Sequence, residues 1–171
     1  MDAYDYDFLN TIRSEDKIER AIVYNHDRSV FLPERKGTET EVAFTLEEFL
    51  LMERKILTHS HVDSGYLTDR LLSWADIQTA AFFRLHEIIA ATPQSISAFS
   101  PGMVLPGNLS MRENFLSTYE QLYVNGAMIV DGIVDVNIRQ KEMAKVAKNM
   151  SDYLKENELK FGYKYNEWGI F

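Results

Sequence analysis

Three capping boxes constrain the fold of this chain most, because each one marks the start of a helix. In each box a Ser or Thr is followed three residues later by Glu or Asp, at residues 45–48, 73–76 and 110–113. Short apolar runs typical of strands surround these helix starts. The runs cover residues 18–24, 30–32, 55–58 and 94–99. Because helices and strands interleave, we expect an α+β fold, an α/β sandwich in which helices flank a small mixed sheet.

The other segments are assigned from their apolar spacing and their turn residues. Ile77, Leu85 and Ile88 recur at helical spacing, so we expect the helix that opens at residue 73 to stop just before Thr92. We further expect a helix within 1–16, a strand at 42–44, a break at 125–126, a strand at 127–130, a long helix at 133–157 and an aromatic edge strand at 161–168.

Composition excludes several classes of protein. The formal net charge of −8 argues against a general nucleic-acid binder, since phosphate binding needs a basic surface. The chain has no cysteine, so it has no disulfide frame and no thiolate zinc finger. No apolar run approaches the ~20 residues that span a bilayer, and residues 1–7 are acidic where a signal peptide is basic. We therefore expect a cytoplasmic protein that does not bind membranes.

His59 and His61 are the strongest functional signal in the chain. They follow the apolar run 55–58, and residues two apart on a strand point to the same face. Both imidazoles can therefore reach one metal ion. The alternative is a pair of loop histidines that bond to the backbone.

A carboxylate would complete a site of two histidines and one acid, which is typical of catalytic zinc. Asp76 is one candidate, although helix capping by Ser73 and Asp76 also explains its presence. Asp63 and Asp69 are rival ligands in the preceding loop, and spacing alone does not choose among the three.

A zinc hydrolase also needs a general base that takes a proton from water. Glu19 is the candidate if the strand that it opens lies beside the strand of His59, and Glu39 and Glu41 are alternatives. The sequence contains no phosphate loop, no dinucleotide fingerprint and no nucleophile elbow.

The pattern His59-x-His61, a loop, and Ser73-x-x-Asp76 resembles the zinc motif of the JAB/JAMM (MPN-type) metalloproteases, in their bacterial and phage form. The resemblance covers residues 18–99. It implies His59, His61 and Asp76 as zinc ligands and Glu19 as the glutamate that handles the proton of water. It also implies that Ser73 assists at the reacting carbonyl. Two features depart from the family pattern: the loop 62–72 is longer, and Val62 replaces the proline that usually follows the second histidine.

The length of 171 residues indicates a single domain over 1–171. The resemblance implies a JAB-like core at 18–99, and the helical and aromatic patterns at 110–171 predict a C-terminal helical extension with an aromatic tail. The function that the resemblance implies is a zinc-dependent isopeptidase or peptidase, whose substrate or partner is a protein or peptide. One alternative is a catalytically inactive JAB-like protein that binds or regulates a partner, such as an effector or a phage accessory factor. Another is a nuclease or toxin-like enzyme that uses His59 and His61 as acid and base without metal. The sequence does not define an oligomeric state.

Overall fold

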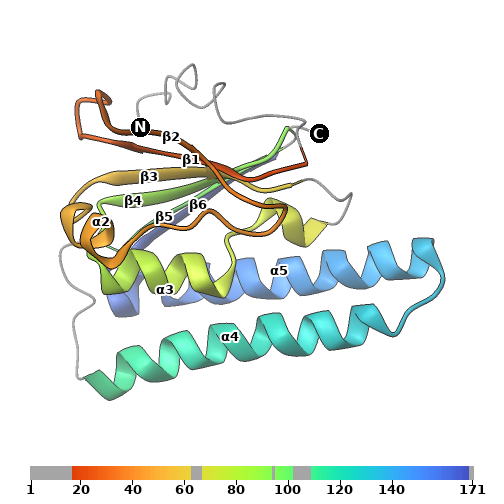
Figure 1. Ribbon diagram of the computed structural model, residues 1–171. Coiled ribbons are helices and arrows are strands. Elements are labelled where there is room, and N and C mark those ends of the chain that lie inside the picture. The colour runs from red at the N-terminus through yellow and green to blue at the C-terminus, as the bar shows by residue number, and fades with distance from the viewer. Residues whose placement is uncertain (1–16, 63–66, 94, 102–108, 170–171) are drawn as a thin grey trace.

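The computed structural model of the chain describes residues 17–62, 67–93, 95–101 and 109–169 (Figure 1). These residues form one six-stranded mixed sheet in the order β2-β1-β3-β4-β5-β6, together with four α-helices. The strands are β1 Arg20–Tyr24, β2 Val30–Lys36, β3 Ile56–Ser60, β4 Glu87–Ala91, β5 Ser95–Ser100 and β6 Lys164–Gly169. The helices are α2 Leu46–Leu51, α3 Trp74–Phe82, α4 Leu109–Asp131 and α5 Val136–Phe161, with a 3-10 turn η1 at Leu67–Arg70. The expected α+β class is confirmed.

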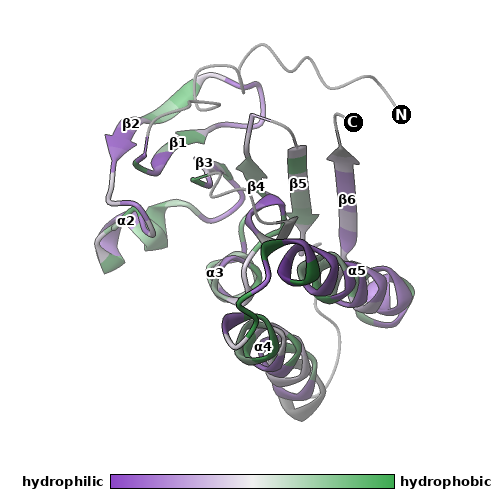
Figure 2. Cartoon of the chain, turned by 90° about the vertical axis from the view of Figure 1, so that its right-hand side faces the viewer, coloured by the Kyte–Doolittle hydropathy of each residue, from purple (hydrophilic) through white to green (hydrophobic). Residues whose placement is uncertain are grey.

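The three longer helices lie on one side of the sheet in two layers. Figure 2 shows α3 and α5 next to the sheet and α4 beyond them. Helix α3 contacts β4 and β5, α5 contacts β6 and η1, and α4 contacts α3 and α5. No helix within the described ranges is long and apolar enough to cross a membrane.

Strand β3 is the central element that the site depends on, and all five of its residues are buried. It pairs antiparallel with β1 and parallel with β4, the parallel pairing being allowed by the crossover through α3. Ala21 of β1 lies opposite His59, and Val23 lies opposite Leu57. Ala21, Val23 and Leu57 belong to the core under the helices. Because side chains alternate along a strand, His59 therefore also faces the helices.

The expected helix after residue 73 is too long. Helix α3 ends at Phe82, and Glu87–Ala91 forms β4 instead. Arg84 has a left-handed φ of 53°, a conformation that does not continue a right-handed helix. Ile88 resumes the apolar spacing only because β4 and α3 contribute to the same core.

The expected break at 125–126 and strand at 127–130 are wrong, because α4 runs without interruption to Asp131. Gly126 permits a close approach between helices: a Cβ there would lie 2.3 Å from Cγ1 of Val146 in α5. Helix α5 begins after the N-cap Asp135 and ends at Phe161, so it starts and stops later than expected. Gly162, with a φ of 68°, caps its C-terminal end.

The expected edge strand in the aromatic tail is confirmed as β6, which pairs antiparallel with β5. Residues 42–44 were expected to form a strand, but they adopt no regular structure and lead into α2. The expected helix within 1–16 lies outside the described residues.

Candidate metal centre

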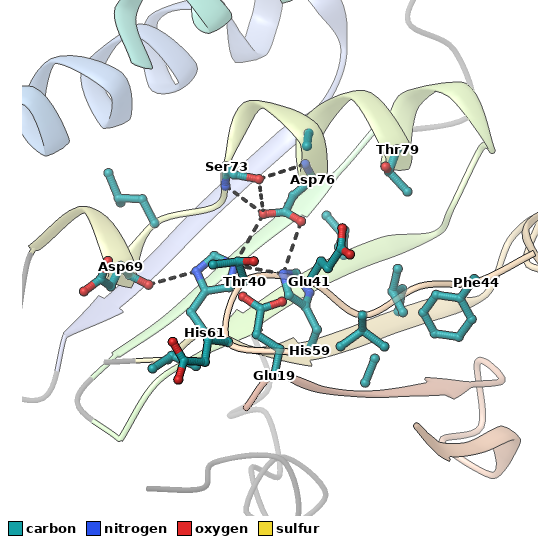
Figure 3. A pocket seen from close by; sticks show the side chains of 18 of the residues that line it. Glu19, Thr40, Glu41, Phe44, His59, His61, Asp69, Ser73, Asp76 and Thr79 are labelled. Atoms are coloured by element: carbon teal, nitrogen blue, oxygen red, sulfur yellow. Dashed lines mark hydrogen bonds and ion pairs between the residues drawn. The ribbon is translucent and has the colours of Figure 1, made fainter. Parts of the chain in front are cut away.

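His59 and His61 stand at the end of β3, where the strand leaves the sheet. The backbone N–H of His61 still donates to the carbonyl of Ala91 at 3.0 Å, which extends the parallel pairing with β4 by one residue. Both imidazoles consequently point to the same side, toward the start of α3 (Figure 3). His59 is only 7% exposed. The structure thus brings the two histidines together as the strand spacing predicts.

The first turn of α3 brings Asp76 to the same place. The Asp76 carboxylate accepts from the backbone N–H of Ser73 at 2.7 Å and from its hydroxyl at 2.8 Å, and the Ser73 hydroxyl accepts from the Asp76 N–H at 3.2 Å. The capping box is therefore complete. The same carboxylate also approaches both imidazoles, so helix capping and metal binding are compatible roles for Asp76.

The potential metal-ligand atoms of three residues lie close together. His59 Nε2 lies 2.9 Å from His61 Nε2 and 3.2 Å from Asp76 Oδ1, and His61 Nε2 lies 3.5 Å from Asp76 Oδ2. Two ligand atoms that are each 2.0–2.1 Å from a tetrahedral ion such as zinc are about 3.3 Å apart. The three observed distances bracket this value. The chemistry and spacing of these three groups therefore fit a tetrahedral metal ion.

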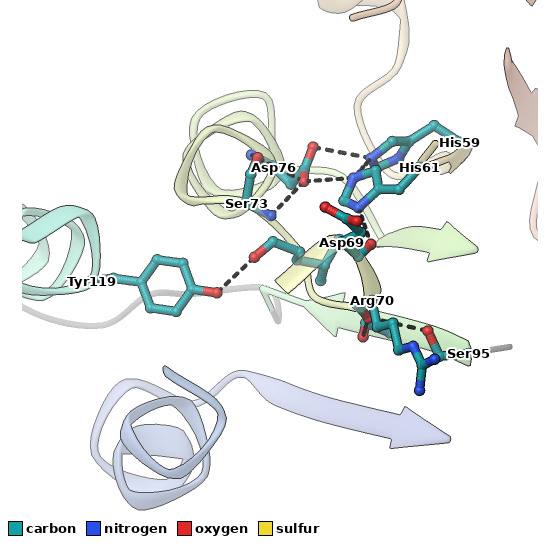
Figure 4. A network of polar contacts seen from close by, with 10 residues as sticks. His59, His61, Asp69, Arg70, Ser73, Asp76, Ser95 and Tyr119 are labelled. Atoms are coloured by element: carbon teal, nitrogen blue, oxygen red, sulfur yellow. Dashed lines mark hydrogen bonds and ion pairs between the residues drawn. The ribbon is translucent and has the colours of Figure 1, made fainter. Parts of the chain in front are cut away.

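The surrounding loop orients His61 for metal binding. His61 Nδ1 lies 2.8 Å from the carbonyl oxygen of Asp69, so Nδ1 carries the proton and donates it. Nε2 is left as the atom that can bind a metal, which is the usual arrangement around a ligating histidine. Asp69 thus supports the site through its backbone (Figure 4). Its side chain is not part of the group that converges, and Asp63 lies outside the described residues.

The loop that holds Asp69 is itself fixed from two sides. The hydroxyl of Ser97 in β5 donates to the carbonyl of Arg70 at 2.6 Å. The hydroxyl of Tyr119 in α4 donates to the carbonyl of Leu72 at 2.7 Å, and Figure 4 shows Tyr119 pointing toward this segment. Leu71 and Leu72 are buried in the core. The end of this loop, residues 69–72, therefore leads into Ser73 in a defined position.

Electrostatics couples the three groups strongly. Burial raises the pKa of Asp76, but the charge and hydrogen bond of His59, followed by those of His61, hold it well below its usual value. Burial lowers the pKa of His61, but the hydrogen bond and charge of Asp76, with a smaller contribution from Glu19, raise it to about 9. In the absence of metal, a protonated His61 and an ionised Asp76 therefore form an ion pair.

Glu19 directly precedes β1 and its side chain points toward the histidines (Figure 3). Its backbone N–H donates to the carbonyl of Thr38 at 2.6 Å, and its carbonyl accepts from Gly37 at 2.8 Å, which fixes the segment beside it. Burial raises the pKa of Glu19, and the charges of the two histidines only partly offset this effect. A carboxylate with a raised pKa is better matched to proton transfer near neutral pH.

One pocket of about 530 Å³ is lined by Glu19, His59, His61, Ser73 and Asp76. Its volume is within the usual range for small-molecule and substrate sites. Glu39 and Glu41, the alternatives to Glu19, line it too. Two contributors were missed by sequence reasoning, namely the Asp69 carbonyl and Tyr123 from α4. A backbone carbonyl has no signature in the sequence, and Tyr123 is one of several aromatic residues on its helix.

No family model, curated protein or solved structure was found to match this chain.

Proposed function

We propose that this protein is a zinc-dependent hydrolase of JAB type that cleaves a peptide or isopeptide bond. The observation that carries the proposal is the convergence of His59, His61 and Asp76 in a pocket that Glu19 also lines. The motif resemblance agrees with this arrangement in the order and identity of the residues. Zinc held by the three ligands would supply a Lewis acid that activates water and polarises the amide carbonyl.

The other roles in the proposed reaction belong to residues of the chain. Glu19 accepts the proton of the attacking water and returns it to the leaving amine, for which its raised pKa suits it. The Asp69 carbonyl holds His61 in the tautomer that leaves Nε2 free. Ser73 orients Asp76 through its backbone N–H and its hydroxyl. In the role that the JAB resemblance implies, the hydroxyl turns its single proton from Asp76 to the reacting carbonyl oxygen, and the backbone N–H continues to hold the Asp76 carboxylate.

Metal content tests the first part of the proposal. The purified protein, incubated with zinc chloride at neutral pH and desalted, is expected to retain one zinc per chain by elemental analysis. The double variant His59→Ala/His61→Ala and the single variant Asp76→Ala should retain none. Asp69→Ala is the matched control, because it removes a nearby carboxylate and keeps the backbone carbonyl. Wild-type protein without stoichiometric zinc would refute the proposal and favour a binding protein with the same fold.

Hydrolysis tests the second part. The zinc-loaded protein is incubated with a mixture of linear and isopeptide-linked peptides, and new termini are read by mass spectrometry. Glu19→Gln should retain zinc and reduce the rate by about 10²–10⁴-fold, the usual contribution of a general base. Glu39→Gln and Glu41→Gln should reduce the rate of hydrolysis less than Glu19→Gln does. A larger loss in either of these two variants would move the role of base away from Glu19.

A further inference from the structure

The pocket is not uniform, and its two ends differ in chemistry. Figure 3 shows Asp69 at one end, Phe44 at the other, and the two histidines with Asp76 between them. Phe44 belongs to a set of apolar side chains that line the pocket from β1, β3, β4, α2 and the segment before α2. We name this set the apolar chamber and define it by Ala21, Val42, Phe44, Phe49, Leu57 and Ile88.

The walls of the apolar chamber are held in place by packing and hydrogen bonds. Phe49 stacks on Phe83, with ring centroids 4.5 Å apart, and meets the edge of Phe44 at 5.5 Å. The guanidinium of Arg35 lies 4.9 Å from the centre of the Phe44 ring and donates to the Ala43 carbonyl at 3.0 Å. A preorganised wall loses little conformational entropy when a ligand binds, so the chamber is suited to selective binding.

The part of the pocket nearer the metal ligands is acidic. Figure 3 shows Glu19, Glu41 and Asp69 near the two histidines, and Glu39 also lines the pocket. None of the described residues that line the pocket is Lys or Arg. A ligand carboxylate that does not bind the metal would therefore meet like charge without a Lys or Arg to pair with, which disfavours its binding.

We propose that the apolar chamber binds a large apolar side chain of the substrate next to the bond that is cut, and that the pocket discriminates against substrates with a free carboxylate there. The substrate class is then an internal peptide or isopeptide bond beside an aromatic or large aliphatic residue. This inference rests on the proposed metal-dependent function, because the metal fixes the position of the amide. The chamber adds a selectivity that the three metal ligands do not provide.

The size of the effect follows from burial of apolar surface. Complete burial of a phenyl-sized group favours binding by about ten- to hundredfold relative to a ligand that lacks it. Simple hydroxamates isolate this contribution, since each places the same chelating group on zinc and varies only the attached chain. The three probes are acetohydroxamate, 3-phenylpropanohydroxamate and succinic monohydroxamate, whose chain ends in a carboxylate.

The experiment measures the affinity of the three hydroxamates for the full-length zinc-loaded protein by calorimetry. 3-Phenylpropanohydroxamate should bind at least about tenfold more tightly than acetohydroxamate, and succinic monohydroxamate should bind no more tightly than acetohydroxamate. Thr79→Phe places a ring into the pocket from α3 and should abolish the gain. Phe44→Ala removes a wall and should reduce it. Leu50→Ala is the matched control, because Leu50 is on α2 like Phe49 but is 65% exposed and outside the pocket.

The possible results separate the two proposals. If zinc and acetohydroxamate bind but the phenyl group adds no affinity, the chamber is not a subsite and the proposed function stands. The same conclusion follows if Thr79→Phe retains the full gain, even where Phe44→Ala fails to fold. Tight binding of succinic monohydroxamate would overturn the discrimination against carboxylates. If no zinc binds, both proposals fail.

Discussion

The ion pair between His61 and Asp76 predicts an unusual dependence of stability on pH in the metal-free protein. The pKa of His61 is raised from 6.5 to about 9 in the folded state. A histidine with a raised pKa stabilises the fold fully below its unfolded value, and this contribution is lost as pH rises through the folded value. We therefore expect the free energy of unfolding to fall between pH 6.5 and about 9.

The expected loss of stability follows from the size of the pKa shift of His61. A difference between 6.5 and about 9 corresponds to on the order of 3 kcal/mol. Such a loss is a large part of the total stability of a domain, which is about 5–15 kcal/mol. The effect should therefore be visible in ordinary denaturation curves.

The assay is urea denaturation, monitored by circular dichroism in the presence of a chelator, at half-unit steps from pH 6 to 9.5. His61→Gln is the control, because glutamine does not titrate, and the quantity of interest is the difference between the wild-type and variant curves. With saturating zinc the sign should reverse, since protons compete with the metal for histidine and zinc binding strengthens as pH rises. Wild-type and His61→Gln curves that run parallel from pH 6.5 to 9 would refute the ion-pair reasoning.

Two further predictions concern the framework behind the site. Tyr119→Phe leaves the carbonyl of Leu72 without its buried donor, so we expect a loss of about 1–3 kcal/mol in urea denaturation together with weaker zinc retention. Unchanged stability would mean that the loop before α3 does not depend on α4. Gly126→Ala forces a methyl group against Val146 and should cost about 1–3 kcal/mol, most of which the double variant with Val146→Ala should recover. Additive losses in the double variant would contradict the close approach of α4 and α5.

The parts of the site that rest on local spacing could be predicted from sequence. His59 and His61 share a face because they are two residues apart at the end of an apolar strand, and the structure places them so. Asp76 was ambiguous, since a capping residue in the first turn of a helix needs no further explanation. Only the position of α3 beside the end of β3 gives Asp76 its second set of contacts.

Features that depend on long-range packing were not predictable. The apolar spacing that continues through Ile88 does not distinguish one long helix from a helix followed by a strand, because both elements bury the same side. Gly126 has the sequence signature of a turn, yet its role is set by Val146 on another helix. The apolar chamber could not be predicted from the sequence either, because Phe44 and Phe49 line it from an irregular segment and a short helix.

The pairing of β5 with β6 has a consequence for the order in which the molecule is assembled. During synthesis β5 emerges with one edge unpaired, and its partner follows only after both long helices have been made. Until then β5 presents a free edge of the kind that promotes association between chains. The proposed metal ligands and Glu19 all lie within residues 19–76. Every group of the centre is therefore synthesised before β6 completes the sheet. A metal ion bound at that stage would hold β3 to α3 before β6 is made and pairs with β5.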